Sequence, residues 1–288
     1  MEEIRFEQKV KVGCGIDVHK DLIVATIQKG NDQIATREFA AYTSSLESLR
    51  DWCKEEGVTH VAMESTGIYW VPVFNVLEEY FEILLVNVRH VKNVPGHKTD
   101  KKDSAWLSKL LLSGLLKGSF IPTRDIRELR DLVRYRKKVV AQVASEKNRI
   151  LKVLEGGNIK LSSVLTNVDG VVGTKIIDSL IAGKTDIDDL MQFYHGKIKV
   201  SREEFRQALE GHLTEHHRLM LRLYKDSITD KERQLARLDV EIERAAEAYC
   251  VEIELLQTIP GVGKSSAITI IREPLKTHHF LFDLFLII

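Results

Sequence analysis

Cysteine is scarce in this chain, with three residues among 288 (Cys14, Cys53 and Cys250), far apart and without a CxxC pair. That number and spacing exclude a disulfide framework and argue against a zinc ribbon. Long apolar runs are also missing, because no stretch reaches the ~18 consecutive apolar residues of a membrane span. The first ten residues, MEEIRFEQKV, contain no signal-peptide core. We therefore expect a soluble, reduced, cytoplasmic protein with no membrane partner.

Net charge is the third absence, since 42 Lys and Arg balance 42 Asp and Glu. The balance conceals three unlike segments: residues 1–88 carry a net charge of −7, residues 89–152 carry +11, and residues 153–288 carry −4. A 64-residue block at +11 attracts nucleic-acid phosphates, although a solvated helix face has a similar composition. The cations of this block that we expect at a nucleic acid include Arg130, Arg134, Arg136, Lys137 and Lys138.

The first part of the chain alternates short β-branched runs with turn residues and helical patterns. Strands are predicted at 10–18, 22–28, 33–39, 58–63 and 81–88, and helices at 44–56 and 69–80. The resulting order, β-β-β-α-β-α-β, is that of an RNase H-like core. This is an α/β fold in which a mixed sheet has helices on its faces.

The remainder of the chain is predicted to be helical. A helix is expected from Thr99 to Leu116, and short helices within residues 155–202. Two longer segments have apolar residues at steps of three and four, which predicts a pair of long helices in a coiled coil, within one chain or between two copies. The first seam consists of Ile126, Leu129, Val133, Arg136, Val140, Val143, Lys147, Ile150 and Leu154, and the second steps from Leu221 to Tyr249.

Four carboxylates occupy positions that favour a metal site. Asp17 and Glu64 end two predicted strands, and Asp100 and Asp103 lie three apart at the start of a helix. If the two strands are neighbours, all four converge at one sheet end, where their repulsion requires divalent cations such as Mg²⁺ or Mn²⁺. Two such ions activate an attacking oxygen and stabilise a leaving oxygen in phosphodiester chemistry. Taken singly, each carboxylate is better explained by a turn, a cap or a helix dipole, and only its context favours a metal site.

Cations surround the aspartate pair. Lys98, Lys101 and Lys102 flank Asp100, which places phosphate-binding groups beside the expected metal ligands.

Four motifs resemble the DEDD transposases of the IS110-like insertion-sequence family, from about Lys11 to Glu273. They are GIDVHKD (15–21), MESTGIYW (63–70), NVRHVKNVPGHKTDKKDSAWLSKLL (87–111) and SFIPTRDIRELRDLVRYRKK (119–138). The resemblance implies a RuvC-like catalytic domain in which Asp17, Glu64, Asp100 and Asp103 hold Mg²⁺. It also implies a coiled-coil region that helps the protein dimerise and hold nucleic acid. Family members excise and insert DNA, acting on element ends and targets, and some are guided by a structured RNA.

The segment IPGVGKSS (259–266) ends like a phosphate-binding P-loop but does not match one. Thr258 stands where that motif requires its first glycine, and a helical pattern precedes it instead of a strand. We favour a helix-hairpin-helix, in which Gly261, Gly263 and Lys264 approach a DNA phosphate without reading sequence. An ordinary helix-helix turn remains an alternative.

The last residues depart from the family pattern. The family continues past the hairpin to a catalytic serine, whereas this chain ends in PLKTHHFLFDLFLII. We therefore expect a RuvC-like domain at residues 1–118, a helical coiled-coil region at 119–250 and a truncated start of the serine domain at 251–288. Strand exchange is then expected to be impaired. Two alternatives remain: a nuclease resembling a Holliday-junction resolvase, and a non-enzymatic nucleic-acid-binding remnant of a transposase.

Overall fold

A computed structural model describes residues 9–30, 33–65, 67–87 and 103–272 of the chain. The chain divides into two compact units, Met1–Ile121 and Pro122–Ile288, and each is described by itself. The expected division into three domains, at residues 118 and 250, stays a prediction. Four of the expected site residues and the apolar tail lie outside the described residues: Lys98, Asp100, Lys101, Lys102 and residues 273–288.

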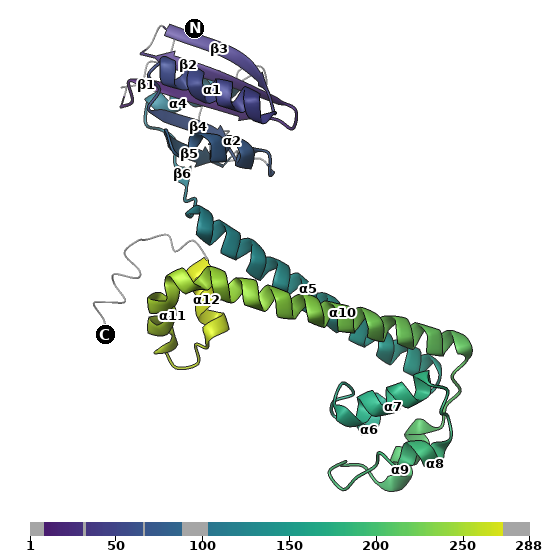
Figure 1. Cartoon of the computed structure of the whole chain (residues 1–288). Helices are drawn as coiled ribbons and strands as arrows, with labels where there is room; N and C mark the ends of the chain where they lie inside the picture. The colour runs from purple at the N-terminus through teal and green to yellow at the C-terminus, as the bar shows by residue number, and fades with distance from the viewer. Residues whose placement is uncertain (1–8, 31–32, 66, 88–102, 273–288) are drawn as a thin grey trace. The chain divides into compact units, whose positions relative to one another are not determined.

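The first unit is built on a six-stranded mixed sheet in the order β3-β2-β1-β4-β5-β6 (Figure 1). Strands β1 to β3 are antiparallel neighbours, β4 and β5 run parallel to β1, and β6 is antiparallel to β5. The predicted order of strands and helices in this unit is confirmed, because β-branched runs and turn residues mark each strand locally. The strands are β1 (Val12–Val18), β2 (Leu22–Lys29), β3 (Gln33–Ala40), β4 (His60–Glu64), β5 (Glu82–Val86) and β6 (Gly118–Ser119).

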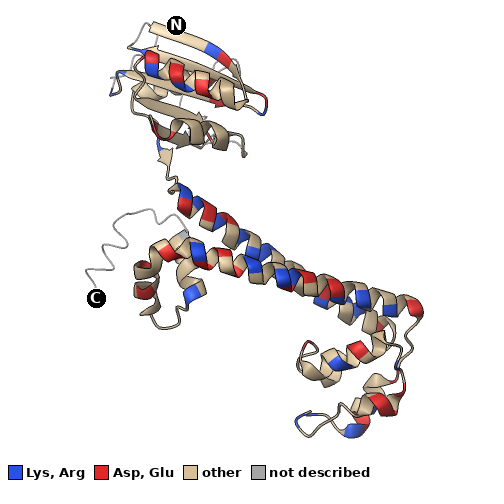
Figure 2. Cartoon of the chain, viewed as in Figure 1, with Lys and Arg blue, Asp and Glu red and all other residues tan. Residues whose placement is uncertain are grey.

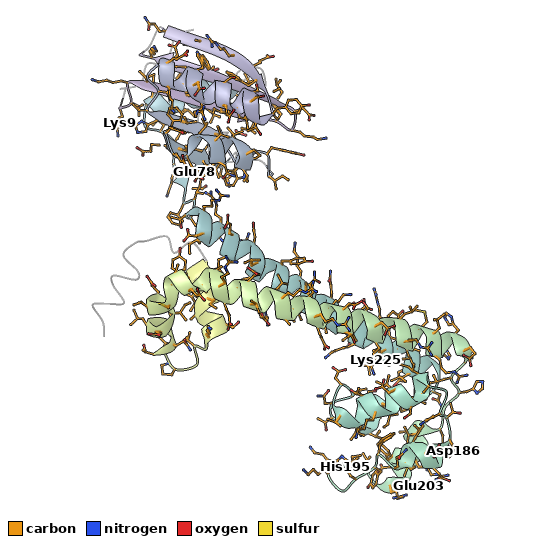
Figure 3. The ribbon with its side chains drawn as sticks, in the orientation of Figure 1. Lys9, Glu78, Asp186, His195, Glu203 and Lys225 are labelled. Carbon is orange, nitrogen blue, oxygen red and sulfur yellow. The ribbon has the colours of Figure 1, made fainter. Side chains whose placement is uncertain are left out.

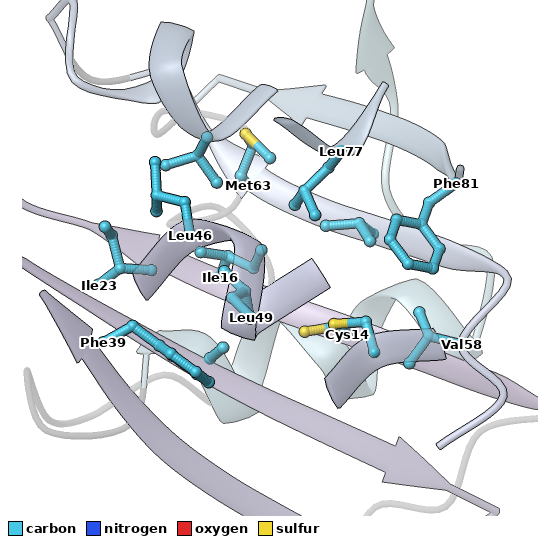
Figure 4. Close-up of a cluster of buried hydrophobic side chains, with 14 of the residues drawn as sticks. Cys14, Ile16, Ile23, Phe39, Leu46, Leu49, Val58, Met63, Leu77 and Phe81 are labelled. Atoms are coloured by element: carbon cyan, nitrogen blue, oxygen red, sulfur yellow. The ribbon is translucent and has the colours of Figure 1, made fainter. Parts of the chain in front are cut away.

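Helices cover both faces of this sheet. Helices α1 (Thr43–Glu55) and α2 (Trp70–Leu77) pack on one face, where Cys14 and Ile16 of β1 join the main apolar core (Figure 4). Helix α4 (Asp103–Leu112) packs on the other face, towards which Gly13 and Gly15 of β1 are turned. A smaller cluster of Val86, Leu107 and Leu110 fills the space under α4. The two faces of β1 are therefore covered by different helices.

The second unit is organised around two long antiparallel helices, α5 (Arg124–Gly156) and α10 (Glu215–Ala246). Contacts between them run in opposite directions along the two helices: Tyr135 meets Gln234, whereas Glu146, farther along α5, meets Lys231, which is earlier in α10. The first of the two predicted long helices, whose seam runs from Ile126 to Leu154, is confirmed, and α5 extends two residues beyond the seam at each end.

The predicted seam of α5 is wrong at one position. Val140, expected to face the other helix, is 43 % exposed, whereas its neighbour Val139 is fully buried. The buried positions Leu129, Val139, Val143 and Ile150 follow steps of ten, four and seven, which keeps one face of the helix against α10. Choosing Val140 moved the predicted seam by one residue in the middle of the helix.

Short helices close the far end of the pair. An apolar cluster there includes Phe205, Ile176 and Leu221, all fully buried. Lys225 of α10, labelled in Figure 3, forms an ion pair with Asp178 of α7 (Val171–Ile181), which connects the short helices to the long pair. The short helices are α6 (Leu161–Val164), α7 (Val171–Ile181), α8 (Ile187–Met191) and α9 (Arg202–Leu209).

The other end of the pair holds the last described helices. After a short 3-10 turn, η2 (Glu247–Tyr249), come α11 (Cys250–Gln257) and α12 (Lys264–Arg272). Ala267 and Ile268 of α12 are buried against Leu129 of α5 and Ile242 of α10. None of the helices that the structure describes combines the length and apolar character needed to cross a membrane.

Candidate active site and nucleic-acid interface

Asp17 and Glu64 lie side by side at one end of the sheet. The parallel register of β1 and β4 pairs Gly15 with Ala62 and Ile16 with Met63, so the next position on each strand is Asp17 and Glu64. Glu64 is also paired with Val86, which belongs to the cluster under α4. Residues paired in a parallel register point to the same face, and Asp17 shares its face with Gly15. Both carboxylates are therefore on the face of the sheet that α4 covers.

Helix α4 places Asp103 at the same end. A Cβ built on Gly15 would lie 2.1 Å from the Ser104 carbonyl oxygen, and one built on Gly13 would lie 2.8 Å from Leu112. The helix therefore runs antiparallel to β1, with its first turn over Gly15 and its last over Gly13. Asp103, one residue before Ser104, is at the end of α4 nearest Asp17. The glycines permit this close approach, since any side chain at position 15 would meet the helix backbone.

His19 is a neighbour of this site that the sequence pattern did not indicate. Its Nε2 lies 3.0 Å from Oδ2 of Asp17, whose side chain is 18 % exposed. The spacing Asp-x-His at a strand end puts both side chains on one face, and this was the available signal. An imidazole beside a carboxylate that holds a metal orients that ligand.

The structure thus places three of the four expected carboxylates at the same end of the sheet, two by strand register and the third by the docking of α4. The fourth, Asp100, lies outside the described residues. Within residues 9–30, 33–65, 67–87 and 103–272, no three His, Cys, Asp or Glu side chains are grouped closely enough to hold a metal ion. The donor set nevertheless fits a hard divalent cation, because it consists of carboxylate oxygens at a half-buried strand end.

In the second unit, four of the expected basic residues lie on one face of α5, with Arg130 half-buried and the other three exposed. Arg130, Arg134, Lys137 and Lys138 are spaced i, i+4, i+7 and i+8, away from the buried seam. Basic residues occur along both long helices (Figure 2). Arg134, Lys137 and Lys138 are exposed and make no hydrogen bond or ion pair with another described residue. A cavity of about 460 Å³ on the helix pair is lined by polar side chains, namely Gln142, Asp230, Lys231, Arg233, Gln234 and Arg237. We call Arg130, Arg134, Lys137 and Lys138 the basic face.

Arg136, the fifth expected cation of this helix, points to the other long helix. Its Nε donates to Oδ1 of Asp239 at 2.5 Å and its Nη2 to Oδ2 at 3.3 Å. The Asp239 carboxylate raises the pKa of the guanidinium. This two-bond pair links α5 to α10, which gives Arg136 a structural partner.

The expected hairpin lies between α11 and α12. Gly261 has φ of +85°, a conformation that favours glycine, and no neighbouring atom crowds Gly261 or Gly263. Lys264 is the first residue of α12, and its Nζ is 3.0 Å from Oε1 of Glu243 on α10. The turn therefore exposes backbone beside a lysine that already has an acidic partner.

Carboxylates at adjacent strand ends, on a mixed sheet with helices on both faces, are compatible with the RNase H-like class of folds. A family model described as Transposase, that of the IS110-like DEDD transposases, matches residues 14–159. This is half of the chain, and it includes β1, β4, α4 and α5. The protein therefore belongs to the IS110-like DEDD transposase family. No curated protein matches the chain.

Proposed function

We propose that this transposase cleaves and transfers DNA strands in a reaction that depends on Mg²⁺ or Mn²⁺, held by Asp17, Glu64 and Asp103 together with Asp100. The observation that carries the proposal is that Asp17 and Glu64 each follow the last pair, Ile16 and Met63, in the parallel register of β1 and β4, on the face where α4 begins. Bound divalent ions supply Lewis acidity to the phosphodiester and lower the pKa of a bound water. The protein's own part is to fix the carboxylates at a rigid strand end.

The test uses Asp17→Asn and Glu64→Gln, which keep shape and remove charge. We expect each to reduce Mg²⁺-dependent cleavage of an element-end DNA by at least about 100-fold, the upper end of what changes around a metal ligand cost. Asp21→Asn is the matched control, because Asp21 is exposed just beyond β1. Mg²⁺ binding to the protein alone, measured by titration calorimetry, should weaken in parallel.

The same assay separates the alternatives. Cleavage of branched DNA in preference to element ends indicates a resolvase-like nuclease. Salt-sensitive DNA binding that survives Asp17→Asn, without cleavage by the wild-type protein, indicates a non-enzymatic remnant and overturns the proposal.

We infer that the basic face of α5 contacts nucleic-acid phosphates. The free cations Arg134, Lys137 and Lys138 support this, since a phosphate contact does not require an existing ion pair to break. Arg134→Gln, Lys137→Gln and Lys138→Gln should each lower the salt dependence of binding to duplex DNA. The slope of the logarithm of the binding constant against the logarithm of the salt concentration should fall by about 0.9 for each variant. Lys160→Gln is the control, because Lys160 pairs with Glu155. An unchanged slope in all three variants would remove the basic face from the interface.

The turn at Gly261 and Gly263 is proposed to act as a helix-hairpin-helix that contacts a DNA phosphate, with Lys264 beside it. Support comes from the positive φ of Gly261 and the uncrowded glycines. Lys264→Gln should weaken DNA binding without changing sequence preference, because phosphate contacts carry no base information. A footprint that loses protection only at specific bases would contradict this role.

We also propose that the long helices form a coiled coil that helps the protein assemble as a homodimer or higher oligomer. Buried positions spaced as in a coiled coil support it, as do Leu219 and Leu223, one turn apart on α10 and each 51 % exposed. Leu219→Glu with Leu223→Glu should shift the mass measured by light scattering towards the monomer.

A structured RNA guide is tested by whether RNA from the element's end binds more tightly than an unrelated RNA of equal length.

A further inference from the structure

The buried polar side chains of the described residues are concentrated in one place. Five such residues are buried: Thr26, Gln28, Ser104, Ser108 and Ser113. The first four form a single layer between β2 and α4, next to the glycines of β1. Buried polar groups cost free energy unless they are hydrogen-bonded, so a layer of them in one interface calls for a reason.

The layer is fully hydrogen-bonded across the interface. Thr26 and Ser104 are 78 residues apart in the sequence, and their hydroxyl oxygens are 2.8 Å apart. One turn along the helix, the Ser108 hydroxyl shares its proton between the Gln28 side-chain oxygen at 3.2 Å and the Ala105 carbonyl of its own helix at 2.9 Å. On the sheet side, Thr26 also contacts the Thr36 hydroxyl at 2.9 Å, and Gln28 donates to the Gly30 carbonyl at 3.2 Å. Thr26 and Gln28 are therefore each hydrogen-bonded on the sheet side of the interface as well as to α4.

These bonds fix the first half of α4, the half nearer the candidate site. At the other end of the helix, the Leu112 carbonyl accepts hydrogen bonds from the backbone N–H groups of Lys9 and Val10, at 2.7 and 3.2 Å. Leu107 and Leu110 add apolar contacts, and the backbone of α4 packs against the glycines of β1. Apolar contacts are non-directional, and a strand surface of glycines has no side chains to stop a helix from sliding along it. A hydrogen-bonded pair fixes position, which is the best-attested use of buried polar groups. Because Ser104 directly follows Asp103, a slip of α4 moves that carboxylate relative to Asp17.

We propose that Thr26 and Ser104 are positioning residues: their hydrogen bond fixes α4 along β1, places Asp103 opposite Asp17 and Glu64, and so sets the affinity of the site for a divalent cation. This inference rests on the proposed metal site. It assigns a role to a strand, β2, that contributes no carboxylate to that site.

The experiment measures Mg²⁺ binding to the full chain by titration calorimetry and by Mg²⁺-dependent thermal stabilisation, without DNA. Thr26→Val and Ser104→Ala should each weaken Mg²⁺ binding by about 10-fold, as changes next to metal ligands do. Ser113→Ala is the matched control, because Ser113 is buried in the same segment but its hydroxyl donates only to the Lys109 carbonyl. Thr26→Ser keeps the hydroxyl and should retain the wild-type affinity.

The double variant Thr26→Val/Ser104→Ala separates positioning from stability. Removing both hydroxyls leaves no buried partner unsatisfied, because Thr36, the other partner of Thr26, is exposed to water. The unfolding midpoint should therefore return towards wild type while Mg²⁺ binding stays weak. Recovery of Mg²⁺ affinity together with stability would show that the layer only stabilises the fold and would overturn the inference. Wild-type affinity in both single variants would also overturn it. If the wild-type protein itself binds no Mg²⁺, the proposed metal site fails, and this inference with it.

Discussion

The carbonyl oxygen of Ser104 lies directly over Gly15, so close that a Cβ at position 15 would be 2.1 Å from it. The amide nitrogen of Ser108, which donates the helical hydrogen bond to that carbonyl, would be 2.4 Å away. A backbone hydrogen bond of α4, between Ser104 and Ser108, therefore lies in direct contact with Gly15 of β1. Because α4 also carries Asp103, this contact connects a backbone requirement to the candidate active site.

Gly15→Ala should destabilise the first unit by about 1–3 kcal/mol, the cost of overpacking, because the alanine methyl meets backbone atoms that cannot rotate away. Gly13→Ala should cost less, since its nearest neighbours are the ends of the flexible side chains of Leu111 and Leu112. Gly196→Ala, in open space, is the control. Denaturant unfolding measures all three, and equal midpoints for Gly15→Ala and Gly196→Ala would contradict the packing described for α4.

The packing of the helix pair predicts very different losses of stability at two adjacent valines, Val139 and Val140. Val139→Ala removes two fully buried methyl groups and should cost about 2 kcal/mol of unfolding free energy. Val140→Ala, at a 43 % exposed position, should change it by less than about 0.5 kcal/mol. Chemical denaturation of the two variants decides the matter. A larger loss at Val140 would restore the seam expected from the sequence.

The pair Arg136–Asp239 should contribute to stability rather than to DNA binding. A double-mutant cycle with Arg136→Met and Asp239→Asn should give a coupling energy of about 0.5–1 kcal/mol, a modest value because the side chains are 37 % and 48 % exposed. Arg136→Met should leave the salt slope of DNA binding unchanged, in contrast to Arg134→Gln. A slope reduced by Arg136→Met would return Arg136 to the set of phosphate contacts.

A hydrogen bond between Tyr249 and Asp125 predicts a stability change at alkaline pH. Burial and the hydrogen bond that the Tyr249 hydroxyl donates to the Asp125 carboxylate raise the pKa of Tyr249 to about 12. An unfolded tyrosine has a pKa of about 10. The stabilising contribution is therefore complete below about pH 10 and is lost as the pH rises towards 12, where the unfolded chain binds fewer protons than the folded one.

Tyr249→Phe provides the comparison for this prediction. Other groups also titrate in this range, so the measured quantity is the difference in unfolding free energy between wild type and Tyr249→Phe from pH 9 to about 11.5. That difference should shrink as the pH rises, while ultraviolet absorbance reports the formation of tyrosinate. A difference that does not vary with pH would mean that the hydrogen bond does not affect the titration.

The predicted site separates into parts that the sequence revealed and parts that it did not. Asp17 and Glu64 were found because each ends an apolar run, and runs are local. The polar layer of Thr26 and Ser104 gave no signal, since two hydroxyl residues 78 positions apart are related only through the fold. Arg136 was predicted both as a phosphate contact, from its charge, and as a seam position, from its spacing; its bond to Asp239 of α10 agrees with the seam.

By itself, the sequence determined where the strands and long helices form, because β-branched runs, turn glycines and apolar spacing act within a few residues. It also determined that carboxylates stand at two strand ends and that cations concentrate in one block. Only the tertiary structure decided which face of β1 receives α4, which valine enters the seam, and which arginine is left free on the basic face. Periodicity marks a face of an element, but which partner covers that face depends on packing and hydrogen bonds between residues far apart in the chain.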